Sequence, residues 1–160
     1  MHLHKRPPTK GSYLELSEKK YYGLSLTLSP AAMATIKAHF EDLGVGPNDF
    51  DLIVTGDLGQ LGKEILLTLA QAEGISLGGK LTDCGTLVFD NTKQDVHAGG
   101  SGCGCSAITL CSHLLNRLNT GKLKRILFCG TGALLSPTST QQGLPIPGVC
   151  HAVSICGGDK

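Results

Sequence analysis

The chain has 160 residues, of which 41% are hydrophobic and 17% charged. This balance suits one globular domain and excludes a disordered chain. The formal net charge is +1, aromatic residues make up 4%, and tryptophan is absent. The chain therefore lacks both a strong positive field and a platform of stacking side chains, and we expect no nucleic-acid partner. Its sequence holds no apolar run of the roughly 18 residues that a membrane-spanning helix needs.

The first twenty residues differ in composition from the rest of the chain. Residues 1–20 are polar and basic and contain Pro7-Pro8, so we expect a loose N-terminal segment followed by one domain over residues 21–160. Within the domain, residues 22–28 alternate between apolar and polar positions. Such alternation is typical of a half-buried strand, which we predict here.

A helix is predicted after this strand. Ser29 followed by Pro30 has the residue types of a helix cap and of the first helical position. Apolar residues then recur at helical spacing until Gly44, a residue that commonly ends helices. His39 lies on the face of this helix that we expect to be solvated.

A buried strand and a second helix should follow. Residues 51–55 form a short apolar run of the kind found in buried strands. Residues 56–59, Gly-Asp-Leu-Gly, form a turn, and Asp57 in it is expected either to bond its own backbone or to contact a ligand. The helical stripe that we predict to be buried comes next, at Leu61, Ile65, Leu69 and Ala72.

The second half of the chain continues the alternation of strands and helices. We predict a hairpin strand over 86–89, followed by a helix from 107 to 118 that begins after a glycine-rich cluster. His113 lies on a face of this helix that we expect to be solvated. A strand over 125–129, which ends in a glycine turn, and a last strand over 149–155 complete the domain. Strands that alternate with helices imply a sheet covered on both faces, which is an α/β fold.

The seven cysteines indicate a reducing compartment, because their number is odd and several lie inside apolar runs. Cys103 and Cys105, together with Cys84 and His97, raise the possibility of a zinc site. The usual two-residue spacing between paired ligands is missing, however. We therefore expect no metal site, and we interpret these cysteines as small residues that let a helix approach the sheet.

Three blocks of the sequence resemble one family. They are VTGDLGQLG (Val54 to Gly62), DVHAGGSGCGCSA (Asp95 to Ala107) and GTGALLSPTSTQQG with the segments that follow it (Gly130 to Val153). Together they resemble the stage V sporulation protein AD family, a thiolase-like family of spore formers, over roughly residues 24–155. The resemblance implies the C-terminal half of a thiolase-like fold. That half is a three-layer α/β/α arrangement with a mixed five-stranded sheet whose last strand is antiparallel.

The resemblance also implies that catalysis is lost. Thiolase-like enzymes place one active site between two similar halves: the first supplies a cysteine nucleophile, and the second supplies a histidine after its second strand and an asparagine or histidine at a glycine-rich helix start. Here these two positions fall on Thr55 or Gly56 and on Gly100. None of these residues titrates near neutral pH, as a general base must. His97 lies close to the second position but is a poor substitute.

The ligand that the resemblance implies is dipicolinic acid, a planar dianion, free or as its calcium chelate. The glycine cluster opens a helix, and such a start presents unpaired N–H groups to an anion. Hydroxyl donors and a carboxylate that could face the calcium ion lie in the same two blocks. The expected ligand-binding residues are Thr55, Asp57, His97, Gly100, Ser101 and Cys103, with no cofactor and no catalytic residue.

The partners and the location expected of the chain also come from the resemblance. We expect it to act with membrane proteins of the spore's dipicolinic acid channel, in the forespore cytoplasm and peripheral to the spore inner membrane. Its protein partner would be a second copy of itself or the missing N-terminal half. Two alternatives stay open at this point: an active acyltransferase or ketoacyl synthase that borrows a cysteine from a first half, and a truncated product that folds poorly.

Overall fold

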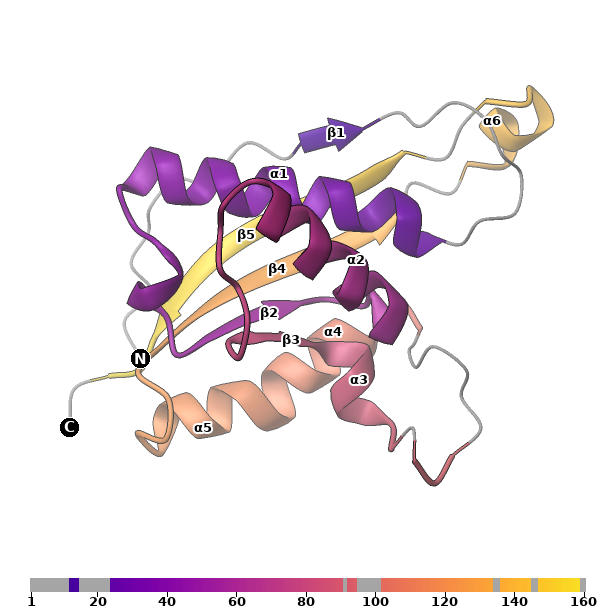
Figure 1. Ribbon diagram of the computed structural model, residues 1–160. Helices are drawn as coiled ribbons and strands as arrows, with labels where there is room; N and C mark the ends of the chain where they lie inside the picture. Colours follow the sequence, from indigo (N-terminus) through magenta and orange to yellow (C-terminus); the bar gives the residue numbers. More distant parts are fainter. Residues whose placement is uncertain are drawn as a thin grey trace.

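The computed structural model describes residues 12–14, 24–90, 92–94, 102–133, 136–144 and 147–158. These residues form one mixed sheet with helices on both faces (Figure 1). Helices α1 and α2 lie on one face, and α3, α4 and α5 lie on the other. This confirms the three-layer α/β/α arrangement. The strands are β1 (Ser12–Leu14), β2 (Leu52–Thr55), β3 (Leu81–Asp83), β4 (Arg125–Ala133) and β5 (Gly148–Cys156).

The helical segments lie between these strands. They are α1 (Leu24–Leu43), the 3₁₀ turn Pro47–Asp49, α2 (Gly59–Ala72), α3 (Cys84–Val88), α4 (Cys105–Thr109), the π-helical turn Leu110–Leu114, α5 (Leu115–Asn119) and α6 (Pro137–Gln141). The segment from α4 to α5 runs without a break, so the helix predicted after the glycine cluster is confirmed, with a π-helical turn in its middle.

The sheet has the strand order β1-β5-β4-β2-β3. Strand β2 pairs in parallel with β3 and with β4, whereas β4 and β5 pair antiparallel from Arg125↔Cys156 to Ala133↔Gly148. The antiparallel last strand is therefore confirmed. Four strands make up the main sheet, and the short β1 at its edge brings the number to five. The structure differs from the sequence predictions mainly in three places, of which two concern strands and one concerns the buried side of a helix.

The first difference lies at residues 24–28, which belong to α1 and not to a strand. Leucine at every second position, at 24, 26 and 28, suggested a strand. In the structure these residues form the start of α1. Pro30 lies inside the helix, where its missing N–H costs one backbone hydrogen bond. Ser29 is not a cap: its buried side chain donates a hydrogen bond from Oγ to the carbonyl of Gly62 in α2, at 2.9 Å.

The second difference is the phase of α2. The helix exists where it was predicted, but Leu61 is 52% exposed and Ala72 is also exposed, so the predicted stripe is not the buried one. The buried positions of α2 are Gly59, Gly62, Leu66 and Ala70. Gly62 determines which side of α2 is buried, because its carbonyl accepts the hydrogen bond from Ser29 and α1 therefore packs on the side of α2 that carries Gly62. The side with small residues packs most closely, so it becomes the buried one.

The third difference concerns residues 86–89, where a helix takes the place of the predicted hairpin strand. Helix α3 covers Cys84–Val88, and the strand of this region is β3, a few residues earlier. Asp83 caps α3, since its side chain accepts a hydrogen bond from the N–H of Gly85. Such a cap satisfies a backbone donor at the helix start and favours a helix over a strand.

Strand β4 continues through the glycines for which the sequence predicted a turn. Gly130 and Gly132 pair with His151 and Val149 of β5. Strand β2 ends opposite Cys129, so this last part of β4 extends past β2, as Figure 1 also shows. The end of β4 thereby lies beside the turn that follows β2.

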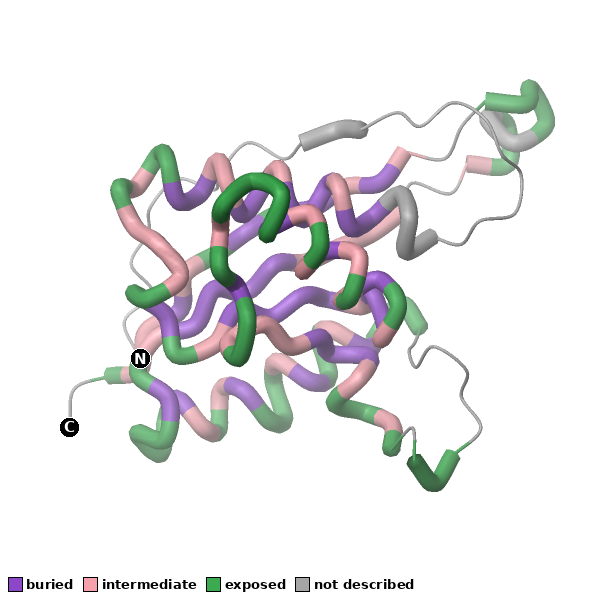
Figure 2. Tube along the Cα trace, viewed as in Figure 1, coloured by how far each residue is buried: buried purple, intermediate pink, exposed green. Residues whose placement is uncertain are grey.

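Two hydrophobic cores hold the layers together. The first lies between the sheet and helices α1 and α2, with Ile36, Phe50 and Leu66 among its buried members. The second lies between the sheet and the α4–α5 segment, with Leu114 and Ile126 among its members. Figure 2 shows the buried residues along the middle of the sheet and on the inner sides of the helices.

His39 belongs to the first of these faces and is not solvated. Its side chain is 3% exposed, and its Nε2 lies 2.9 Å from the Oγ of Ser154 on β5. The prediction of a solvated His39 was therefore wrong, because a partner on a distant strand satisfies the ring. His113 is exposed, as predicted.

The phase of α2 can be tested with one pair of matched substitutions. Leu66→Ala removes a fully buried side chain and should lower the free energy of unfolding by about 2–5 kcal/mol. Leu61→Ala, at an exposed position of the same helix, should change it by less than about 0.5 kcal/mol. Urea unfolding followed by circular dichroism measures both. Equal losses for the two variants would contradict the observed phase.

Candidate functional site

The candidate site lies where the parallel strands β2 and β3 end, and Asp83 is at its centre. The Asp83 side chain is fully buried. Its carboxylate accepts hydrogen bonds from Thr55 Oγ1 at 2.7 Å and from the N–H groups of Leu58 at 2.8 Å, Gly59 at 3.0 Å and Gly85 at 2.9 Å. A buried charge needs such a set of donors. Asp83 thereby ties the β2–α2 turn to the start of α3.

Sequence reasoning missed Asp83. The available signal was its position, an aspartate at the end of a short apolar stretch and directly before Cys84 and Gly85, which fits a helix cap. Gly59 is a second requirement of this arrangement. Its φ is +67°, a conformation that favours glycine, and it turns the N–H of Gly59 toward Asp83.

Thr55 lies at the end of β2, and its side chain is fully buried. Its hydroxyl donates to the carboxylate of Asp83. The hydroxyl proton of Thr55 is therefore engaged inside the protein, and the expected role of Thr55 as a hydrogen-bond donor to a ligand would require it to leave Asp83.

Gly56 is held against β4. A Cβ atom on Gly56 would lie 2.9 Å from the backbone nitrogen and 3.0 Å from the Oγ1 of Thr131, and 3.4 Å from the Cβ of Ser106. The first of these contacts is with backbone, which cannot rotate away as a side chain can. The space that a larger side chain at position 56 would need is therefore filled by β4 and the start of α4.

Asp57 follows on the same turn and is half-buried. Its N–H donates to the Oγ1 of Thr131 at 3.1 Å. Its negative charge contributes to raising the pKa of the thiols of Cys84 and Cys105. The preceding residue, Gly56, lies beside Ser106 at the start of α4. The structure thus brings together two parts of the site that are far apart in the sequence.

The cysteines near this turn are held in the neutral form. Burial raises the pKa of the Cys84 thiol to about 12, and the charge of Asp83 adds to the effect. The pKa of the Cys105 thiol is also raised, first by burial and then by the charges of Asp57 and Asp83. The thiolate is the nucleophilic and metal-binding form. Neither thiol is therefore suited to nucleophilic catalysis at neutral pH.

Of the residues expected at the glycine cluster, the structure describes only the last. Cys103 is exposed and lies just before α4. His97, Gly100 and Ser101 lie outside the described residues. Among the residues that the structure describes, no group of three or more histidine, cysteine, aspartate or glutamate side chains could hold a metal ion.

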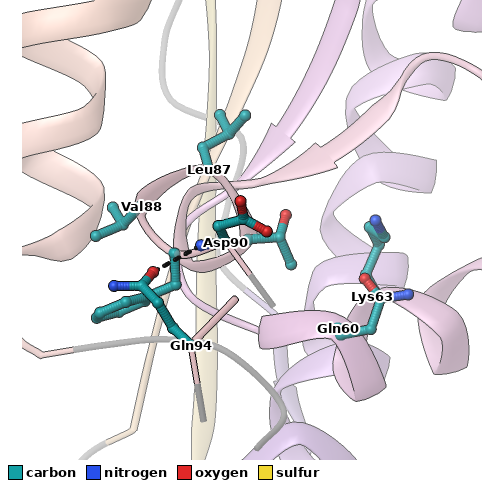
Figure 3. Close-up of a pocket in the computed structure, with 8 residues that line it drawn as sticks. Gln60, Lys63, Leu87, Val88, Asp90 and Gln94 are labelled. Carbon is teal, nitrogen blue, oxygen red and sulfur yellow. Dashed lines mark hydrogen bonds between the residues drawn. The ribbon is translucent and has the colours of Figure 1, made fainter. Parts of the chain in front are cut away.

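Two grooves flank α3 beside the site. The larger, about 600 Å³, lies between α2 and α3. Figure 3 shows Gln60 and Lys63 on one side of it and Leu87, Val88 and Asp90 on the other, with the N–H of Asp90 bonded to Gln94. The smaller groove, about 250 Å³, lies between α3 and the α4–α5 segment. Neither groove is lined by Thr55 or Asp57.

The helices that the structure describes include none with the length and apolar character needed to cross a lipid bilayer.

Comparisons with known proteins identify relatives of the chain. Residues 8–156 match the family model described as stage V sporulation protein AD. The stage V sporulation protein AD of Bacillus subtilis (strain 168) is 43% identical over 145 residues, which cover 91% of this chain and 43% of that protein. The chain thus spans less than half the length of this relative.

Among solved structures, the chain is similar to 3-oxoacyl-[acyl-carrier-protein] synthase III from Aquifex aeolicus. The TM-score is 0.43 and the sequence identity 12%, over 79% of this chain and 38% of the synthase.

The role of Asp83 gives a testable prediction for the site. Asp83→Asn keeps the size of the side chain but turns an acceptor of four hydrogen bonds into a group that is also a donor. At least one buried N–H then loses its partner, and the free energy of unfolding should fall by about 3 kcal/mol. Thermal and urea unfolding measure the loss.

Asp90→Asn is the matched control for this prediction. Asp90 is exposed and also accepts a backbone hydrogen bond, from the N–H of Thr92 at 3.0 Å. Its substitution should leave the unfolding midpoint unchanged within error, because water can replace the lost acceptor. A stable Asp83→Asn variant that unfolds at the same midpoint as Asp90→Asn would show that Asp83 does not organise the site.

Proposed function

Since the chain belongs to the stage V sporulation protein AD family, we propose that it is a non-catalytic protein of sporulation that binds dipicolinic acid. In this proposal it serves the uptake of dipicolinic acid into the developing spore and its release at germination. The observation that carries the non-catalytic part is Gly56, whose backbone is packed against Thr131 where a thiolase-like enzyme would need room for an imidazole.

Two further features support the absence of catalysis. The thiols of Cys84 and Cys105, which lie nearest to the site, have raised pKa values and stay protonated at neutral pH. Thr55, the other residue at the expected histidine position, is buried and bonded to Asp83. A general base that titrates near neutral pH, as proton transfer requires, is not found at either of these positions.

The ligand part of the proposal follows from the donors that the turn has already used. The N–H of Asp57 bonds to Thr131, and those of Leu58 and Gly59 bond to Asp83. The β2–α2 turn therefore has no spare N–H group at these three positions for a carboxylate. We propose that the anion is bound instead by the N–H groups of the glycine cluster, with the hydroxyl of Ser101.

Asp57 then has a different part in binding. A carboxylate repels a free dianion, but it is a preferred ligand of calcium, which takes six to eight oxygen ligands. Asp57 is half-buried and follows Gly56, which lies beside Ser106 of α4, the helix that the glycine cluster enters. We propose that Asp57 faces the calcium ion of the calcium chelate. The membrane proteins of the spore channel are the proposed partners, at the inner membrane of the forespore.

The proposal predicts distinct effects for three substitutions in a calorimetric titration with dipicolinate. Gly100→Leu should abolish binding, because a side chain fills the space of the anion. Ser101→Ala removes one hydrogen bond to a charged group and should weaken binding by roughly tenfold. Asp57→Asn should weaken binding only when calcium is present, since its carboxylate acts on the cation.

The control for this titration is Asp90→Asn, an exposed carboxylate outside the proposed site, which should bind like the unmodified chain with and without calcium. If all four variants bind dipicolinate with the affinity of the unmodified chain, the ligand site lies elsewhere. If the unmodified chain gives no heat with either form of the ligand, the proposed ligand is wrong for this chain.

A second prediction concerns catalysis. The chain should show no condensation or thiolysis of short or long acyl-thioesters above the rate without protein, because its site lacks both a thiolate and a base. The measurement is product formation followed by chromatography. Turnover that disappears on replacement of any single cysteine would contradict the proposal and favour the acyltransferase alternative.

A further inference from the structure

The charged residues of the chain are unevenly distributed along the sequence. Twelve of the thirteen aspartates and glutamates lie in residues 1–95, and residues 96–158 contain none. That second stretch holds four lysines and arginines, all within residues 117–125: Arg117, Lys122, Lys124 and Arg125. We name these four residues the α5–β4 corner. Although the whole chain has a formal net charge of only +1, this asymmetry indicates a local surface for an anionic partner.

The backbone of the α5–β4 corner is held by the rest of the domain. The N–H of Leu123 donates to the carbonyl of Arg117 at 3.1 Å, and the N–H of Gly157 donates to the carbonyl of Lys124 at 2.8 Å. The side chain of Leu123 is buried in the second core, whereas Lys122 and Lys124 on either side of it are exposed. The buried leucine therefore fixes the turn, and the two lysines extend from it into solution.

One carboxylate is bonded to the corner in the part of the chain that the structure describes. The Oδ2 of Asp51 accepts hydrogen bonds from the N–H groups of Arg125 at 2.9 Å and Lys124 at 2.6 Å, and these bonds hold the pKa of Asp51 below its ordinary value. Four cations and this carboxylate leave an excess of three positive charges. Asp49 and Lys80 lie at the same end of the sheet and carry opposite charges, so they leave the excess unchanged.

A role in helix capping does not account for this excess. Arg117 lies in the last turn of α5, where a cation compensates the partial negative charge of a helix end. Lys122 and Lys124 follow the helix, however, and are both exposed. Neither of their ammonium groups forms an ion pair with a carboxylate among the described residues. The two lysines are therefore available to an anionic partner outside the chain.

We propose that the α5–β4 corner docks the chain directly on a lipid bilayer that contains anionic headgroups. The corner is a projecting turn, and neither of the grooves beside α3 is lined by any of its residues. A bilayer needs no hollow of matching shape, because its headgroups move laterally and gather under a fixed set of cations. Clusters of lysine and arginine bind anionic membranes by this attraction.

The inference rests on the proposed function only in placing the chain at a membrane. The contact itself is with lipid and needs no protein partner. Figure 1 shows the turn between α5 and β4 at the end of the α4–α5 segment that lies away from α3. A chain docked through the corner therefore keeps the site around Asp83 directed away from the bilayer, where a water-soluble ligand reaches it.

Co-sedimentation with lipid vesicles tests the contact. The unmodified chain should bind vesicles made of equal parts of phosphatidylglycerol and phosphatidylcholine in about 50 mM salt, should leave them in about 0.5 M salt because the charges are then screened, and should not bind vesicles of phosphatidylcholine alone. The double variant Lys122→Gln/Lys124→Gln should bind the anionic vesicles at least roughly tenfold more weakly, because it loses the attraction of two cations.

The matched control removes two lysines elsewhere on the chain. Lys63→Gln/Lys93→Gln changes a half-buried and an exposed lysine outside the corner and has the same net charge as the first double variant. It should bind the anionic vesicles like the unmodified chain, and circular dichroism shows whether both variants are folded. Gly100→Leu should also bind these vesicles normally, so loss of dipicolinate binding and loss of lipid binding are measured separately.

Four outcomes would overturn the proposal. The first is an unmodified chain that does not bind the anionic vesicles, and the second is equal binding by the two double variants. The third is release of the chain from the vesicles by inorganic phosphate at constant ionic strength, because the corner would then bind a single anion. The fourth is a duplex DNA that binds through Lys122 and Lys124 more tightly than the vesicles do, which would make the corner a nucleic-acid surface.

Discussion

The carboxylate of Asp83 is the feature on which the arrangement of the site depends. Its four hydrogen bonds reach β2 through Thr55, the β2–α2 turn through Leu58 and Gly59, and the start of α3 through Gly85. Three elements are thereby fixed at one buried point. The arrangement also has a chemical consequence. A turn with free N–H groups is an anion site, whereas the N–H groups of Asp57, Leu58 and Gly59 in this turn are bonded within the protein.

Gly56 fixes the same turn against β4, on the side away from Asp83. Strand β4 extends past the end of β2, and this extension brings the backbone of Thr131 to the place where a Cβ of residue 56 would lie. The thiols nearby are kept neutral by burial and by the charges of Asp57 and Asp83. Burial first, and then the charges of these two carboxylates, raise the pKa of both thiols beside the turn.

Sequence reasoning predicted the elements whose pattern allows one interpretation. The apolar run that contains β2, the strands β4 and β5 and the helix after the glycine cluster were all found. The predictions failed where a contact with another segment of the chain determines which residues are buried. The many leucines of α2 allow several buried faces, and the close contact of Gly62 with Ser29 selects one that hydrophobicity alone does not favour. His39 was missed because its Ser154 partner lies on a distant strand, and three of the four donors to Asp83 also lie on a distant segment.

The α4–α5 segment begins where the glycine cluster of the proposed ligand site ends. Its first residue, Cys105, closes the glycine cluster, and Ile108 lies one helical turn further on. A helix transmits displacement along its axis because each backbone N–H is bonded to a carbonyl one turn earlier. The π-helical turn at Leu110–Leu114 widens the helix directly after this first turn, and such turns often occur at functional sites.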